Sequence, residues 1–217
     1  MAETESIVGS LVRKARRVER LPAPERRALV WLIIAIPFVG LISLSMGLRE
    51  DLAQKFTETR YLVEQSAALA TAIVAAFAAF WAVVPSAPRW TLFAPLIPLS
   101  VWLGSLGLGS IQDWVTAGPA GVSFSPDWFC LPGIAAVGSV PAVVMAMMLR
   151  GGAPKFPHLG VALGGLAAAG IGNFGLRLFH VEDASIMVLV WQLGTVALLV
   201  VLAGCLGPRI HSWHHVQ

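Results

Sequence analysis

Six long apolar stretches limit what this chain can fold into. They cover residues 28–48, 64–84, 91–111, 129–149, 158–178 and 184–206, and each is nearly free of Lys, Arg, Asp and Glu in its middle. About 20 apolar residues are enough for an α-helix to cross the hydrocarbon core of a bilayer. The pattern therefore predicts an all-α membrane protein, a bundle of six transmembrane helices lying in lipid.

The composition excludes most soluble classes. Hydrophobic residues make up 57% of the chain and charged residues 12%, whereas a soluble domain carries about 25% charged residues. So many apolar side chains cannot be hidden in one soluble core of this size. The two cysteines are too few for a disulfide scaffold, and the apolar content is too high for a disordered chain.

The basic residues predict the orientation in the membrane. An even number of spans places both termini on one side. If that side is the cytosol, it holds eleven of the 15 Lys and Arg residues, and the outside holds four. Because short basic loops stay in the cytosol, we expect both termini to be cytosolic. The predicted regions are a basic N-terminal segment (1–27), the membrane domain (28–206) and a cytosolic tail (207–217).

The N-terminal segment has the pattern of a basic amphipathic helix. Over residues 4–21, apolar residues recur at helical spacing and basic residues lie largely opposite them. Such a helix could lie on the anionic inner leaflet, or it could dock into a groove on a soluble partner. The residues that would carry docking are Ile7, Leu11, Arg13, Lys14, Arg17 and Val18.

Polar residues also gather where the fourth run begins and the fifth ends, on the predicted outer side. Asp127 precedes Cys130, and His180 is followed by Glu182 and Asp183. A thiolate, an imidazole and carboxylates could hold zinc or copper, with Cys130 and His180 as ligands. These outer-side residues show neither the C-x2-C nor the H-x3-H spacing of metal sites, and a solvated loop with helix-capping acids explains them more simply.

Charge inside the predicted spans is confined to the ends of the apolar runs. Glu64 begins the second run and Arg177 lies near the end of the fifth, and both side chains are expected to reach outer water by snorkelling. A carboxylate near the midplane, which ion-coupled transporters usually need, is missing. The sequence also lacks Walker, G-x-S-x-G and H-E-x-x-H motifs. We therefore expect neither an enzyme nor a cofactor. A small oligomeric transporter or channel is kept as the alternative, because the fifth run is rich in glycine.

Short motifs along most of the chain, roughly residues 10–207, resemble the NrsF-type membrane anti-sigma factors, the negative regulators of sigma F. The resemblance is carried by Gly47-Leu-Arg-Glu-Asp-Leu52, Arg60 with Glu64, Asp113-Trp114, Cys130, Leu149-Arg-Gly-Gly-Ala-Pro154, the stretch 160–172, Glu182-Asp183 and Trp191. Each motif is short, and the resemblance takes its specificity from the order and spacing of the motifs along the chain.

The resemblance implies a function and a partner. Such a protein would hold an extracytoplasmic-function sigma factor at the bacterial inner membrane and release it under redox or metal stress of the envelope. It would contact the sigma factor and the bilayer but no nucleic acid directly, and it could form a homo-oligomer. The sensing residues would be Cys130 and His180, with Asp127, Glu182 and Asp183 around them.

The chain departs from the family pattern at one of these positions. Family members typically carry a second outer cysteine in a stretch resembling L-H-C-P-x-D, whereas this chain has Leu178-Phe-His-Val-Glu-Asp183, with His180 in the place of that cysteine. An intramolecular disulfide with Cys130 is then impossible. Metal ligation, sulfenylation of Cys130 and an intersubunit disulfide remain chemically open.

Overall fold

The computed structural model describes residues 21–84, 86–118, 130–150 and 157–180 and a few positions between 194 and 205. Five long helices and two short ones make up this part of the chain, which contains no strand, so the all-α prediction is confirmed there. The helices are α2 (Pro24–Met46), α3 (Leu52–Lys55), α4 (Thr59–Ala82), α5 (Trp90–Phe93), α6 (Leu96–Ala117), α7 (Cys130–Leu149) and α8 (Pro157–Phe179).

Four segments are long and apolar enough to cross a membrane: Pro24–Met46, Thr59–Ala82, Trp90–Ala117 and His158–Phe179. Within α7, Ala135–Leu149 forms a shorter apolar stretch. The sixth predicted span, 184–206, falls largely outside the described residues. The count of six spans and the cytosolic placement of the termini therefore stay predictions.

The observed helices differ from the predicted spans at their ends. α4 begins at Thr59 rather than at residue 64, and α6 continues to Ala117 rather than ending at 111. The predicted third span also has a break, because α5 ends before Pro95 and α6 starts after it. Proline is well tolerated at the start of a helix but cannot donate a backbone hydrogen bond within one.

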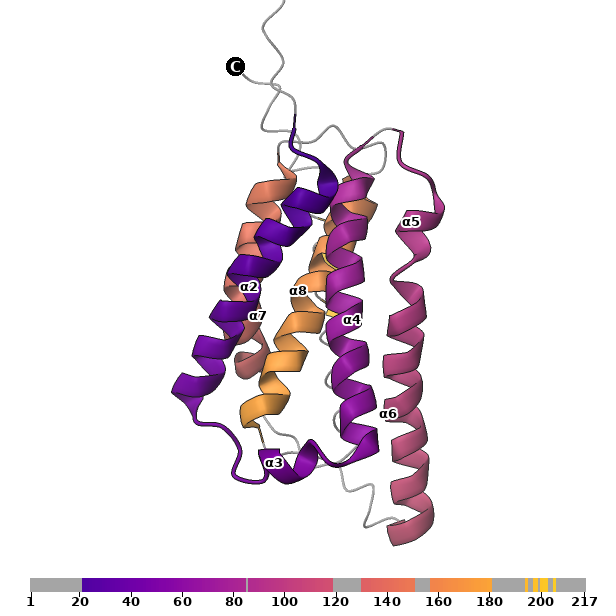
Figure 1. The fold of residues 1–217 in the computed structure, drawn as a ribbon. Helices are drawn as coiled ribbons and strands as arrows, with labels where there is room; N and C mark the ends of the chain where they lie inside the picture. The colour runs from indigo at the N-terminus through magenta and orange to yellow at the C-terminus, as the bar shows by residue number, and fades with distance from the viewer. Residues whose placement is uncertain are drawn as a thin grey trace, which may run out of the picture.

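Helix α8 is the centre of the bundle (Figure 1). It packs against α4, α7 and α2, while α6 lies on the far side of α4. Glycine and alanine bring α4 and α8 close together. A Cβ added at Gly160 would lie 3.4 Å from Ala82 Cβ, and one added at Gly170 would lie 3.2 Å from Ala72 Cβ. Small residues allow this close approach of backbones, which drives helix association in membranes.

The same helix uses other glycines against α7. A Cβ at Gly164 would come within 2.8 Å of Met145 Cγ, and one at Gly175 within 2.7 Å of Val137 Cγ1. The glycines of α8 thus face three neighbouring helices, because a Cβ at Gly175 would also lie 2.5 Å from Val39 Cγ1 of α2. The outward faces of α2 and α6 remain apolar, as shown by Ile33, which is 70% exposed. Such surfaces suit lipid rather than water.

Candidate functional site

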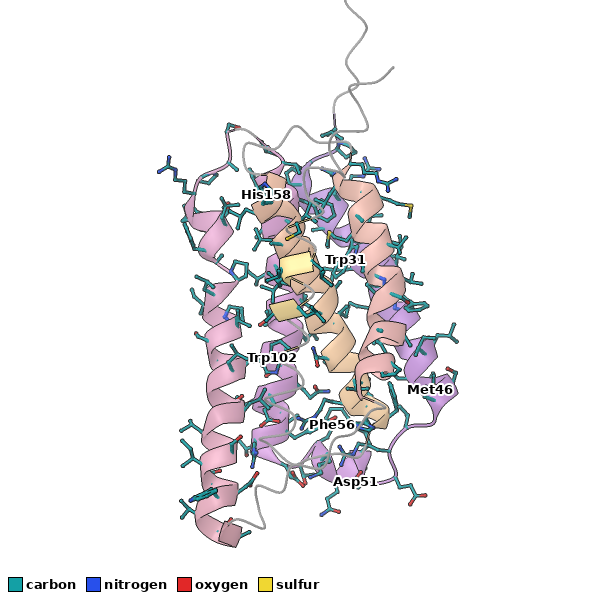
Figure 2. All side chains as sticks on the ribbon, turned by 180° about the vertical axis from the view of Figure 1, so that it is seen from behind. Trp31, Met46, Asp51, Phe56, Trp102 and His158 are labelled. Carbon is teal, nitrogen blue, oxygen red and sulfur yellow. The ribbon has the colours of Figure 1, made fainter. Side chains whose placement is uncertain are left out.

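Charged residues gather at the end of the bundle where α4 begins and α8 ends. Figure 2 shows Asp51 and Phe56 at this end and His158 at the opposite end. Four helices and the loop after α2 contribute to the cluster, which we call the ion network. Its members are Arg49, Asp51, Lys55, Glu58, Arg60, Glu64, Asp113 and Arg177.

Glu64 lies at the centre of the ion network. Its Oε1 lies 3.1 Å from Nε of Arg60, one helical turn earlier, and its Oε2 lies 3.0 Å from Nη2 of Arg177 on α8. The side chain of Glu64 is only 4% exposed and that of Arg177 only 10%. One carboxylate thus bonds two guanidinium groups, and its pair with Arg177 lies in a largely water-free place, where an unpaired charge would be costly.

Arg60 carries the network across to α6. Its Nη1 donates to Oδ1 of Asp113 at 3.2 Å, and its Nη2 to Oδ2 at 3.5 Å. The guanidinium lies directly over Gly109 of α6, so that a methyl group at Gly109 would overlap it. The missing side chain of this buried glycine therefore provides the space in which Arg60 reaches both carboxylates.

Tyr61 and Gln65 hold α8 by its backbone. Tyr61 donates its hydroxyl hydrogen to the carbonyl oxygen of Arg177 at 3.0 Å, and Gln65 donates to that of Phe174 at 3.2 Å. The Arg177 guanidinium lies 5.3 Å from the centre of the Tyr61 ring, a distance at which the ring face attracts the cation. α4 therefore contacts both the charge and the backbone of the last turns of α8.

Arg49 closes the end of α8 from the loop after α2. Its backbone N–H donates to the carbonyl oxygen of Leu178 at 3.1 Å, and its Nη1 donates to that of His180 at 3.3 Å. Asp51 accepts two further bonds from the guanidinium, at 2.6 and 2.8 Å. Because the last carbonyls of a helix need partners and favour a cation, this fully buried arginine acts as a C-terminal cap for α8.

A small open pocket of about 70 Å³ lies within the ion network. Three cationic side chains, two carboxylates and one phenol line it. They are Lys55, Arg60 and Arg177, Glu58 and Glu64, and Tyr61. Lys55 Nζ and Glu58 Oε2 pair with each other at 3.0 Å.

The burial of Glu64 and Arg177 corrects the sequence prediction. Both side chains were expected to snorkel to water, yet they are buried and bonded to each other. A lone charge at the end of an apolar run is typical of snorkelling. The signal that points to pairing is that two such charges, of opposite sign, stand at the predicted outer ends of the second and fifth runs.

The predicted sensing residues are described only in part. Cys130 is the first residue of α7, and His180 directly follows α8, its backbone N–H donating to Leu176 at 2.9 Å. No group of three or more metal-ligating side chains occurs among the described residues. The remaining candidates lie outside those residues: Asp127, Glu182 and Asp183, and the docking residues Ile7, Leu11, Arg13, Lys14, Arg17 and Val18.

The opposite end of the bundle has a buried cation of its own. Arg27, the fourth residue of α2, donates from Nη2 to the carbonyl oxygen of Met148 at the end of α7. Its guanidinium also lies 4.7 Å from the centre of the Phe80 ring on α4. This residue was assigned to the basic N-terminal segment, and the structure shows it joining three helices.

Comparison with protein families matches residues 11–213 to NrsF, described as negative regulator of sigma F. No curated protein and no solved structure shows a significant match to the chain. The motifs that carry the resemblance now have a structural basis, because Arg49, Asp51, Arg60, Glu64 and Asp113 all belong to the ion network. Since the match extends over most of the sequence, the chain belongs to the NrsF family of negative regulators of sigma F.

Proposed function

We propose that this protein is an inner-membrane anti-sigma factor that holds an extracytoplasmic-function sigma factor and releases it on redox or metal stress of the envelope. The observation that carries the proposal is the family match over residues 11–213. The four apolar helices support attachment to a membrane. The charge distribution supports cytosolic termini, which would place the N-terminal segment where a sigma factor is found.

Docking would use the N-terminal segment, with its apolar and basic faces. This segment leads directly into α2, and the first buried side chain of that helix is Arg27. Because Arg27 contacts both α4 and α7, a shift of these helices would change how the segment leaves the membrane. The contact supports a route by which a signal received in the membrane domain reaches the docking segment.

Sensing would take place where α7 begins and α8 ends. A Cβ added at Gly133 would lie 2.7 Å from Leu176 Cδ1 and 3.9 Å from Phe179 Cζ. Cys130 precedes Gly133 by about one helical turn, and His180 follows Leu176 by about one turn. This packing of α7 against α8 supports the proposal that Cys130 and His180 receive one chemical signal. They would receive it beside the C-terminal cap that Arg49 forms.

Co-purification tests the docking step. The full chain and a variant lacking residues 1–20 are extracted in detergent and mixed with purified sigma factors of the extracytoplasmic-function class from the same cell. We expect one of them to bind the full chain and to lose at least about tenfold in affinity for the shortened one. A variant lacking residues 210–217 is the control and should bind normally. Equal retention by both shortened chains would exclude the N-terminal segment as the dock.

A transcriptional reporter tests the sensing step. Replacing Cys130 by Ser should change sigma-dependent transcription under oxidant or metal challenge but not the unchallenged level. Ser45→Ala, which alters an exposed hydroxyl of α2, is the matched control. An unchanged response in the Cys130 variant would remove this thiol from the mechanism.

A further inference from the structure

We propose that the pocket in the ion network binds a phosphate group, supplied either by a phospholipid headgroup or by free phosphate. The cationic side chains around the pocket, Lys55, Arg60 and Arg177, come from three different helices. Two carboxylates also line it, and Asp113 is bonded to Arg60 beside it, so that an anion would be held by N–H donors rather than by an excess of positive charge. This inference does not depend on the proposed anti-sigma activity.

The two carboxylates that line the pocket are already bonded to its cationic side chains. Both oxygens of Glu64 accept from guanidinium groups, and Glu58 is bonded to Lys55. Arg60 uses three N–H groups in its bonds to Glu64 and Asp113. A guanidinium carries five N–H groups in a planar fork that matches the oxygens of phosphate. The side chain of Arg60 therefore has donors beyond those bonds, and it is 36% exposed.

The N-terminus of α4 adds to the attraction for an anion. Glu58 is its N-cap residue but makes no side-chain capping bond. The first N–H groups of a helix and its dipole place partial positive charge at this end, between Lys55 and Arg60. The site thus combines a helix terminus with side-chain cations around a cavity.

Size and depth in the membrane both suit a phosphate group. The pocket of about 70 Å³ is several times the ~10–15 Å³ that a cavity needs to hold one water molecule. It also lies where the apolar stretch of α4 starts, which is the depth at which lipid headgroups begin. A bound phosphate would contact α4 and α8 together and would stabilise their contact.

Two measurements on the detergent-solubilised full chain test the proposal. In the first, inorganic phosphate is titrated against sodium chloride of equal ionic strength while the thermal unfolding midpoint is followed, since a ligand of the folded state raises it. In the second, native mass spectrometry follows retention of phosphatidylglycerol, with diacylglycerol of the same acyl chains as the phosphate-free control.

The variants are Lys55→Gln at the pocket and Arg26→Gln, which removes the same charge from an exposed position of α2. We expect binding to weaken at least about tenfold in Lys55→Gln, because a charged hydrogen bond is lost, and to be unchanged in Arg26→Gln. If inorganic phosphate raises the unfolding midpoint and the rise depends on Lys55, free phosphate is a ligand. If only the retention of phosphatidylglycerol depends on Lys55, the ligand is the lipid headgroup. Binding in neither measurement, or equal weakening in both variants, would overturn the proposal.

Discussion

Glu64 of α4 and Arg177 of α8 form a buried ion pair, with 3.0 Å between Oε2 and Nη2. Replacing Glu64 by Gln keeps the shape but leaves the guanidinium groups of Arg60 and Arg177 without their shared counter-charge. Removing one partner of a buried pair typically costs about 3–5 kcal/mol, and we expect a loss of that order in the free energy of unfolding, measured in mixed detergent. Glu58→Gln, at a side chain that is 43% exposed, should cost less than about 1 kcal/mol. Similar losses in the two variants would show that Glu64 is not the centre of the network.

The Arg60 guanidinium lies where a side chain of Gly109 would be, so a methyl group added at Gly109 should disturb the ion network. Gly109→Ala should lower the free energy of unfolding by about 1–3 kcal/mol, because the guanidinium must move. Gly104→Ala on the same helix is the control, since a Cβ there meets no atom within 4 Å. It should leave stability unchanged or raise it by up to about 1 kcal/mol.

A double-mutant cycle separates this mechanism from a general effect on α6. If the methyl group acts through Arg60, then Gly109→Ala should cost little in a background that already carries Arg60→Ala. Additive losses from the two substitutions would contradict the contact.

Arg49 caps α8, so its removal should loosen the end of that helix. In Arg49→Ala, the carbonyl oxygen of His180 loses a charged hydrogen bond, and the local opening free energy of residues 174–180 should fall by about 1–3 kcal/mol. Hydrogen–deuterium exchange of that peptide measures the change. Exchange of α2 residues 30–40 serves as the internal reference and should stay constant, and faster exchange in both segments would indicate general unfolding instead.

Arg27 and Arg26 are adjacent and carry the same charge, yet they should behave differently. Arg27 is buried against Met148 and Phe80, while Arg26 is exposed. Arg27→Gln should lower the free energy of unfolding by about 1–3 kcal/mol, and Arg26→Gln should change it by less than about 0.5 kcal/mol. If only the charge of the N-terminal segment matters, the two variants will have the same free energy of unfolding.

The positions of the long helices could be predicted because length and hydropathy determine which segments fit a bilayer. α7 and α8 lie within one residue of their predicted limits at both ends. Prediction was less accurate where charges occur, since hydropathy places the start of the second span after Arg60 and the end of the third before Asp113. In the folded chain these two residues neutralise each other, so α4 starts earlier and α6 runs further than the apolar pattern indicates.

The ion network itself could not be deduced from the sequence. Its bonds join residues such as Glu64 and Arg177 that are more than 100 positions apart, and its geometry depends on the rotation of each helix about its axis. The sequence alone does show that the charges stand at corresponding ends of the apolar runs. It does not show that Gly109, an ordinary-looking residue of a glycine-containing helix, is what allows Arg60 to reach its partners.

The glycine and alanine contact between α4 and α8 also has a mechanical consequence. Hydrogen atoms and methyl groups have no alternative rotamers, so this interface cannot adapt by rearranging side chains and should transmit displacement rather than absorb it. α4 carries Glu64 near one end and Phe80 near the other, about 24 Å apart at 1.5 Å per residue. The two helices would then act as a stiff lever, in which a small tilt at the ion network moves the ring against which Arg27 rests.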